Sequence, residues 1–330
     1  MYKIICEEYF LENVTFIVPA YNDELYIRKC IDSILACKIS DFELIIVDDG
    51  STDKTSEICR KYAQNYKQIT YIRQENKGVS VARNVGVAAA TKDYIIFVDA
   101  DDQITQFGSE AWSNGKEDVI VFDYYVDNPQ AVVSVFTDQE PPLKKKAFIR
   151  KYLLTDVFNT VWGKAFNREF VQVNKIEFPV GMKMGEDAVF MGQCFSKASK
   201  IQYKKFPFYI YSKNENSVSV KPITSFDDQE RLLVFKESFL NTIQFNEANM
   251  FKRKAIGDVM SSLRSQTSSF KKFKALMYDL NAHQQLLELL RSDNSYLDIR
   301  RLLQTMCLKN NWIVPLYIEL KFENWRVGDK

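Results

Sequence analysis

The sequence is poor in the residues that build zinc sites and disulfide frameworks. Its 330 residues include one histidine, His283, and six cysteines, none of them in a C-x-x-C pair. Protein zinc ligands are mostly closely spaced cysteines and histidines, so neither a zinc site nor a disulfide framework is favoured. Most of the cysteines fall in segments with helical periodicity, as buried thiols of a protein in a reducing compartment do.

Long hydrophobic runs and an excess of charge are also missing. No stretch approaches the roughly 18 uninterrupted apolar residues that indicate a transmembrane helix, and the acidic N-terminus lacks the apolar core of a signal peptide. The net charge of +1 argues against an extended nucleic-acid-binding surface. We therefore expect a cytoplasmic protein that does not bind nucleic acid.

The sequence does contain a regular alternation of strand-like and helix-like segments. Its composition, 46% hydrophobic and 26% charged, is typical of a globular protein. Between Val14 and Phe97 apolar runs alternate with amphipathic segments, which predicts an α/β fold with a doubly wound, mostly parallel sheet flanked by helices. Further strands are expected over Asp118–Val126 and Tyr203–Tyr211, whereas the proline-containing stretch Asn128–Pro142 is expected to be irregular. Beyond about residue 225 the pattern is entirely helical.

The most informative stretch is Tyr94–Asp102, in which an apolar run leads directly into three carboxylates. Such a run predicts a buried strand, and ligands bind at the carboxyl ends of strands in open α/β sheets. Three adjacent acids repel one another unless a cation lies among them, and Mg²⁺ or Mn²⁺ with oxygen ligands is the natural cation. The alternative is an acidic turn that only ends the strand.

Three other polar segments are expected at the same edge of the sheet. They are Pro19–Asn22, Asp48–Ser51 and Arg83-Asn84. A carboxylate such as Asp49 can accept a hydrogen bond from the imide of uracil, Tyr21 can lie along a base, and Arg83 can balance a diphosphate. Alternatively these are ordinary turn and capping residues.

The order and spacing of these blocks resemble those of the family 2 glycosyltransferases with the GT-A fold, of the bacterial surface-polysaccharide type. The blocks are Val18–Asn22, Val47–Asp53, Asn76–Gly86 and Asp99–Asp102, followed by Glu186-Asp187 after a glycine-containing loop. The resemblance covers about residues 13–215. Processive members of the family carry Q-x-x-R-W, whereas the only Trp-Arg pair here is Trp325-Arg326, so transfer of one sugar per encounter is favoured.

The resemblance implies an inverting, metal-dependent transfer of a sugar from a UDP-sugar to a glycan or lipid-linked glycan. Asp101 would ligate Mn²⁺ or Mg²⁺, and Asp187 would be the general base, with Glu186 and Trp162 beside the acceptor. The residues implied in donor binding are Pro19, Ala20, Tyr21, Asp49, Lys77, Arg83, Asp99 and Ala100.

These roles agree with the chemistry of the residue types. A cation stabilises the charge of a leaving nucleotide diphosphate, and inversion needs one carboxylate base and no covalent nucleophile. Alternatives remain for the second half of the site. Glu186-Asp187 could be an acidic pair favoured by a helix N-terminus, and Trp162, close to Lys164, could be a core residue.

The resemblance also suggests a division of the chain. Residues 1–12 would be an N-terminal extension and residues 13–220 a catalytic domain, with a donor half over 13–102 and an acceptor half over 103–220. Residues 221–330 would form a helical C-terminal region.

The C-terminal region has basic clusters and an apolar segment, Trp312–Ile318. This region could rest peripherally on an anionic membrane, pack on the catalytic domain, or join two copies of the chain. Two other functions stay open from the residues alone: a nucleotidyltransferase, and a non-catalytic sugar-nucleotide-binding assembly protein.

Overall fold

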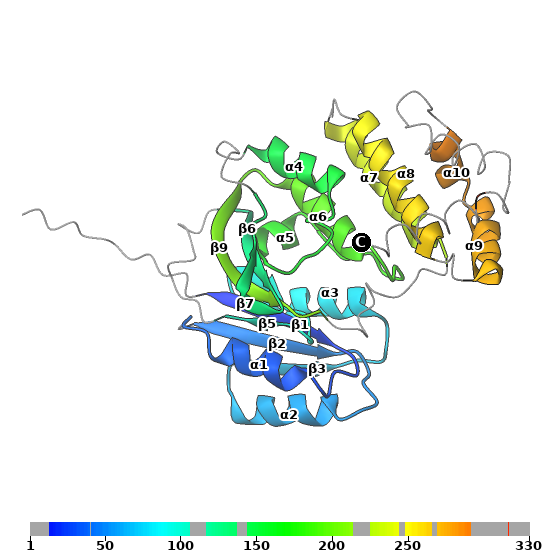
Figure 1. Cartoon of the computed structure of the whole chain (residues 1–330). Helices are drawn as coiled ribbons and strands as arrows, with labels where there is room; N and C mark the ends of the chain where they lie inside the picture. Colours follow the sequence, from blue (N-terminus) through cyan, green and yellow to red (C-terminus); the bar gives the residue numbers. More distant parts are fainter. Residues whose placement is uncertain are drawn as a thin grey trace, which may run out of the picture. The chain divides into compact units, whose positions relative to one another are not determined.

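The computed structural model describes residues 13–39, 41–105, 117–136, 144–213, 225–243, 248–265, 269–291 and residue 316 (Figure 1). The chain divides into two compact units. One comprises Met1–Tyr152 and Asp156–Glu215, and the other Leu153–Thr155 and Asn216–Lys330. Each unit is considered separately below.

The first unit is built on one mixed sheet with strand order β3-β2-β1-β4-β8-β6-β9-β5, to which β7 is added by pairing with β6. The strands are β1 (Val14–Ala20), β2 (Phe42–Asp48), β3 (Ile69–Arg73), β4 (Tyr94–Phe97), β5 (Gln103–Ile104), β6 (Val119–Val126), β7 (Asn128–Val133), β8 (Lys164–Asn167) and β9 (Ile201–Tyr211). The helices of this unit are α1 (Ile27–Leu35), α2 (Thr55–Asn65), α3 (Val79–Ala89), α5 (Arg168–Val173), α6 (Glu186–Lys197) and α4 (Lys145–Leu154), whose last two residues are counted with the second unit.

The half of the sheet formed by β3, β2, β1 and β4 is entirely parallel. All seven residues of β1 and all four of β4 are buried, because helices cover both faces of these strands. In Figure 1, α1 and α2 lie on one face and α3 on the other. The predicted α/β fold of the GT-A type is thus confirmed. The other half of the sheet is mixed, with β8 antiparallel to both β4 and β6.

Helix α3 approaches the sheet closely because it carries a glycine at the contact. A Cβ atom on Gly86 would lie 2.4 Å from Cγ2 of Ile17 in β1. Gly86 therefore sets the distance between α3 and the central strand. Since Arg83 lies on the same helix, this packing also fixes the height of Arg83 above the sheet edge.

The strand that precedes the acids ends at Phe97, and Asp99–Asp102 follow it, as predicted. One local prediction is wrong. The stretch predicted to be irregular contains β7, which pairs with β6. Pro129 within β7 is tolerated because this strand lies off the main strand order, where a missing N–H breaks no central ladder.

The described part of the second unit is helical, as predicted, with α7 (Asp227–Ile243), α8 (Ala248–Ser265), α9 (Phe270–Ala282) and α10 (Gln284–Arg291). His283, between α9 and α10, is buried, and its Nε2 lies 3.0 Å from Oδ1 of Asp227. It is therefore a structural residue of this unit. Apart from Leu316, the apolar segment Trp312–Ile318 lies outside the described residues. None of the helices in the described ranges is long and apolar enough to cross a membrane.

Candidate active site

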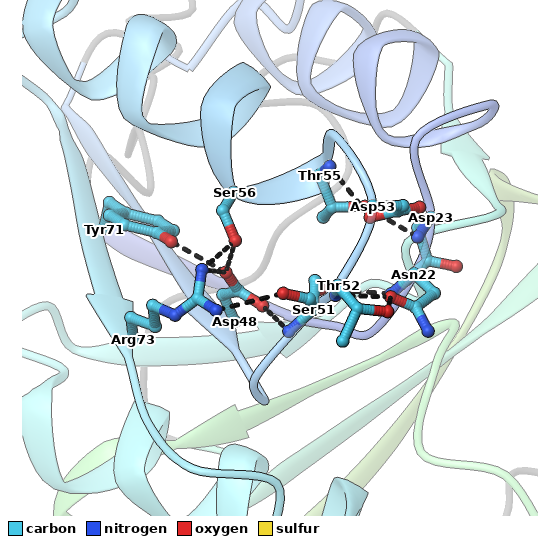
Figure 2. Close-up of polar contacts among 10 residues, drawn as sticks. All are labelled: Asn22, Asp23, Asp48, Ser51, Thr52, Asp53, Thr55, Ser56, Tyr71 and Arg73. Atoms are coloured by element: carbon cyan, nitrogen blue, oxygen red, sulfur yellow. Dashed lines mark hydrogen bonds and ion pairs between the residues drawn. The ribbon is translucent and has the colours of Figure 1, made fainter.

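Asp48 anchors the loop that follows β2. Its buried carboxylate accepts hydrogen bonds from the Ser51 N–H at 2.8 Å, the Ser56 hydroxyl at 2.5 Å and the Tyr71 hydroxyl at 2.7 Å (Figure 2). Burial would raise the pKa of Asp48, but these hydrogen bonds lower it below its usual value. The guanidinium of Arg73 closes the cluster and also donates to the Ser51 carbonyl. Asp48 is therefore a structural anion that fixes the loop.

The neighbouring Asp49 ties this loop to the segment before α3. Its Oδ1 accepts from Gln74 Nε2 at 2.7 Å and from the Lys77 N–H at 2.8 Å, and its Oδ2 accepts from the Gly78 N–H at 2.8 Å. A carboxylate offers about four acceptor positions, so these contacts leave room for one further donor. Asp49 thus combines a structural role with a remaining acceptor position at the sheet edge.

The loop after β1 is joined to the loop after β2 by reciprocal hydrogen bonds. The Asn22 N–H donates to the Ser51 hydroxyl, and Oδ1 of Asn22 accepts from the Thr52 N–H (Figure 2). The Asp49 N–H donates to the Ala20 carbonyl at 2.9 Å. Tyr21 remains 47% exposed at this edge. The two predicted donor-side loops therefore form one connected surface.

Pro19 and Ala20 belong to the buried end of β1, and Ala100 is buried as well, so their side chains contribute to packing. Their backbone positions still lie at the carboxyl edge of the sheet, where the sequence predicted them.

Arg83 is the hub of the site. Only 4% of this residue is exposed, and its guanidinium contacts three carboxylates. Nη2 lies 3.0 Å from Oδ1 of Asp99, and Nη1 lies 3.0 Å from Oε1 of Glu186 and 2.6 Å from Oδ1 of Asp187. Burial would lower the pKa of Arg83, but the three carboxylates raise it above its usual range. Arg83 was predicted to balance a diphosphate. In this structure it joins Asp99 to the pair Glu186-Asp187.

Asp187 lies in the first turn of α6, directly after Gly185 and Glu186. Gly185 has φ +88°, a left-handed conformation that glycine adopts without strain. The Asp187 carboxylate is held at both oxygens: Arg83 binds Oδ1, and the Val161 N–H donates to Oδ2 at 3.0 Å. Burial raises the pKa of Asp187 to about 7, which Arg83 opposes and Glu186 reinforces. A carboxyl that titrates near neutrality is suited to general base catalysis.

The acidic turn after β4 contains side chains of two kinds. Asp102 is buried, accepts from the Tyr209 hydroxyl at 2.6 Å and the Ser212 N–H at 2.7 Å, and has its pKa raised to about 8 by burial and by Asp99. The Tyr209 hydroxyl also accepts from the Asp99 N–H at 3.2 Å. Asp102 therefore holds the turn in place, whereas the Asp99 side chain is 30% exposed beside Arg83.

The chemistry of this turn fits a hard divalent cation. Burial, reinforced by the charges of Asp101, Asp53 and Asp99, raises the pKa of Asp23 to about 7. A cation bound near Asp101 would relieve this repulsion. Within the described residues, however, no three Asp, Glu, His or Cys side chains form a ready metal-binding group. Mg²⁺ is commonly held by one or two carboxylates together with substrate phosphates, which is compatible with Asp101 as a ligand.

Trp162 lies in the hydrophobic core beside this turn. Only 9% of it is exposed, and its ring stacks on those of Tyr209 and Tyr211 at 4.9 and 5.4 Å. Little of the ring is left for a sugar, so the core alternative describes Trp162 better than an acceptor platform does.

Sequence reasoning missed several polar contacts of the site. Gln74 on Asp49, the Val161 N–H on Asp187, and Tyr209 between Asp99 and Asp102 all join residues far apart in the chain. The only sequence signal for any of them is the position of Val161 next to Trp162 and Lys164, between the two carboxylate blocks.

Several known proteins are similar to this chain in sequence. The family model for glycosyl transferase family 2 matches residues 15–172. The chain is 32% identical to the uncharacterized glycosyltransferase EpsJ of Bacillus subtilis, over 63% of each protein. It is also 32% identical to the poly(ribitol-phosphate) beta-glucosyltransferase of Bacillus spizizenii, over 60% of this chain and 32% of that protein. The chain thus spans less than two thirds of the length of these relatives.

Among solved structures, that of S. aureus TarS 1-349 in complex with UDP-GlcNAc matches with a TM-score of 0.67 and 21% identity, over 96% of this chain and 92% of that chain. This match shows a common fold. The family match and the order of the motifs along the sheet edge lead to one assignment: residues 15–172 form a domain of glycosyl transferase family 2.

Proposed function

We propose that the protein transfers one sugar from a UDP-sugar to a hydroxyl of a glycan or lipid-linked glycan, with inversion, in the synthesis of a surface polysaccharide. The observation that carries the proposal is the position of Arg83 between Asp99 and the pair Glu186-Asp187. In this arrangement the guanidinium of Arg83 contacts both Asp99, the proposed donor-binding carboxylate, and Asp187, the proposed general base. The poly(ribitol-phosphate) relative and the UDP-GlcNAc complex of TarS support the polymer class and the donor class.

On the donor side, the joined loops after β1 and β2 would bind the nucleoside. Tyr21 is exposed for contact with the base, and the remaining acceptor position of Asp49 suits the imide N–H of uracil. Asp99, which is partly exposed beside Arg83, would bind the ribose. Lys77, whose backbone is fixed by Asp49, would meet the diphosphate with its side chain.

Mn²⁺ or Mg²⁺ would be held by Asp101, with Asp99 assisting. When bound, the ion would stabilise the negative charge that develops on the leaving diphosphate. No protein proton donor to the leaving group is then required.

On the acceptor side, Asp187 would remove the proton of the attacking hydroxyl. The contacts with Arg83 and Val161 fix both of its oxygens and still leave lone pairs for that proton. Glu186, which shares Arg83 with Asp187, would orient the acceptor. A base on the side of the sugar opposite the diphosphate produces inversion in a single displacement.

This mechanism assigns no role to the helical residues described in the second unit. The roles proposed for this region are the three expected from the sequence: contact with a membrane surface, with the catalytic domain, or with a second copy of the chain.

The test is release of UDP from a panel of UDP-hexoses and UDP-N-acetylhexosamines with Mn²⁺, since donor hydrolysis needs no known acceptor. We expect metal-dependent UDP release by the wild type, and loss of release in Asp101→Ala and Asp187→Asn. The matched control is Glu57→Gln, because Glu57 is an exposed acid on α2.

Donor binding separates the two roles. Asp187→Asn should still bind the UDP-sugar, as measured by calorimetry. If the wild type binds no UDP-sugar, the donor assignment is wrong. If it releases pyrophosphate and forms a nucleotidyl adduct, the reaction is nucleotidyl transfer.

A further inference from the structure

Lys164 is a buried cation that the mechanism above does not use. It is the first residue of β8, pairs with Val121 of β6, and is 4% exposed. Its ammonium makes no ion pair with a carboxylate in the described part of the chain. Burying an ammonium without a counter-charge is costly, so a lysine at this position calls for a physical reason.

The ammonium of Lys164 binds the segment that leads into β8. Nζ donates to the Trp162 carbonyl at 3.0 Å and to the Thr160 hydroxyl at 3.3 Å. It also lies 5.5 Å from the ring centre of Phe158 and 5.7 Å from that of Trp162, within the range of cation–π attraction. Lys164 thus holds residues on both sides of Val161.

Val161 is the residue whose N–H donates to Oδ2 of Asp187. The segment from Thr160 to Trp162 therefore makes two kinds of contact. Thr160 and Trp162 accept hydrogen bonds from Lys164, and the Val161 N–H between them donates to the Asp187 carboxylate. Glycine follows at position 163 with φ +66°, which lets the chain turn into β8 directly after this contact.

We propose that Lys164 is a positioning residue for the general base: its ammonium fixes the Thr160–Trp162 backbone so that the Val161 N–H holds Oδ2 of Asp187 opposite Arg83. The proposal rests on the proposed function, in which Asp187 is that base. Asp187 is then held between two supports, Arg83 from α3 at Oδ1 and the Lys164-ordered segment at Oδ2.

The charge of Lys164 also bears on the titration of Asp187. Burial lowers the pKa of Lys164 to about 7, and the negative charge of Asp187 opposes this shift. The attraction is mutual, so Lys164 favours the ionised form of Asp187. The other charged groups that face Asp187 are Arg83, Glu186 and Asp99. Loss of the lysine charge therefore shifts the ionisation of Asp187 to higher pH.

The test compares Lys164→Met with Lys145→Met in the 330-residue chain. Methionine keeps much of the buried stem and removes the ammonium. Lys145 is a matched control because its Nζ also donates to two oxygens, the carbonyls of Ser196 and Ala198 at the opposite end of α6 from Asp187. The measurement is the pH profile of kcat for UDP release from whichever UDP-sugar of the panel the wild type hydrolyses, with saturating Mn²⁺, together with KM for that donor.

For Lys164→Met we expect kcat to fall about tenfold or more through misplacement of the base, an acid limb moved up by roughly 0.5–1 pH unit, and an unchanged donor KM. For Lys145→Met we expect a wild-type profile. An unmoved acid limb in Lys164→Met, with or without a lower kcat, would overturn the proposal, since loss of packing alone would not change the titration of Asp187.

Two further variants keep the result interpretable. If Lys164→Met does not fold, Thr160→Val removes one of the two acceptors of Lys164 and should lower kcat without changing the donor KM, whereas wild-type kcat in Thr160→Val would overturn the proposal. Asp187→Asn separates this proposal from the proposed function. If Asp187→Asn still releases UDP at the wild-type rate, the assignment of the base fails; if it is inactive, only the role of Lys164 is being tested.

Discussion

Arg83 and Asp187 are 104 residues apart in the sequence, and their side chains meet at 2.6 Å. The same guanidinium reaches Asp99 after β4 and Glu186 at the start of α6. One buried cation therefore connects the parallel half of the sheet, which carries the proposed donor-binding loops, to the helix that carries the candidate base.

Replacement of Arg83 should be the most damaging single change in the site. In Arg83→Met three carboxylates lose their common counter-charge, and we expect the free energy of unfolding to fall by about 3–5 kcal/mol, as for other buried ion pairs with one partner removed. Arg83→Lys keeps the charge but cannot reach three carboxylates with a planar fork, so UDP release should drop by about 100-fold or more. Urea unfolding and UDP release measure the two effects.

Arg60→Lys serves as the control for these variants, because Arg60 is exposed on α2. Near-wild-type UDP release by Arg83→Lys would show that the bridging contacts are not needed for transfer.

The titration of Asp187 predicts the pH dependence of activity. Its pKa is raised to about 7, so at lower pH a growing fraction of the enzyme carries a protonated base. We expect kcat to fall about tenfold for each pH unit below 7, measured at saturating donor and Mn²⁺. An acid limb near pH 4, the range of an ordinary carboxyl, would contradict the assignment.

The same shift predicts an opposite trend for stability. Because the folded protein binds the proton of Asp187 more tightly than the unfolded chain does, this group favours folding below its unfolded pKa, and the contribution is lost as pH rises through about 7. Asp187→Asn should therefore gain stability relative to the wild type above pH 7. Equal urea midpoints for the two proteins at pH 8.5 would argue against a raised pKa.

Asp49 should prove to be both structural and donor-binding. Asp49→Asn replaces one acceptor oxygen with an NH₂ group that faces the donors of Gln74, Lys77 or Gly78. We expect a loss of about 1–3 kcal/mol in the free energy of unfolding and weaker UDP binding by calorimetry. The matched control is Asp41→Asn, a carboxylate of the same type that pairs with Lys92 at the surface. Unchanged stability with lost UDP binding would indicate that Asp49 only reads the base.

Gly86 should control the distance between α3 and the sheet, and hence the position of Arg83 on that helix. In Gly86→Ala the new methyl group would meet Ile17 at 2.4 Å, so either α3 or β1 has to move. We expect a loss of about 1–3 kcal/mol in the free energy of unfolding and lower kcat. Gly257→Ala on α8 is the control, because no atom lies within 4 Å of its added Cβ. Combining Gly86→Ala with Ile17→Ala should recover part of the loss, and strict additivity would refute the steric explanation.

The parallel half of the sheet could be predicted from the sequence because its strands are continuous apolar runs that end in polar loops. The position of the sheet edge followed from that pattern, and with it the neighbourhood of Asp49 and Asp99. By contrast, Pro129 suggested an irregular segment where β7 in fact pairs antiparallel with β6.

The side-chain partners within the site could not be predicted in this way. The sequence predicts Arg83 as a partner of a diphosphate, which stays a prediction, but it did not predict the three carboxylates to which the packing of α3 and α6 brings Arg83. From the sequence Trp162 could be an acceptor platform or a core residue, and only the structure shows that Tyr209 and Tyr211 stack on its ring. These contacts depend on how distant elements pack, and the local pattern of the chain carries no information about that.

The most direct test of the account is the anomeric configuration of the sugar first released from the donor. We propose ¹H NMR of donor hydrolysis with an α-linked UDP-sugar that the wild type accepts, at enzyme concentrations at which turnover outruns mutarotation. The account predicts that the β-anomer appears first, together with UDP, and that Asp187→Asn releases neither. First appearance of the α-anomer would contradict a single displacement assisted by Asp187.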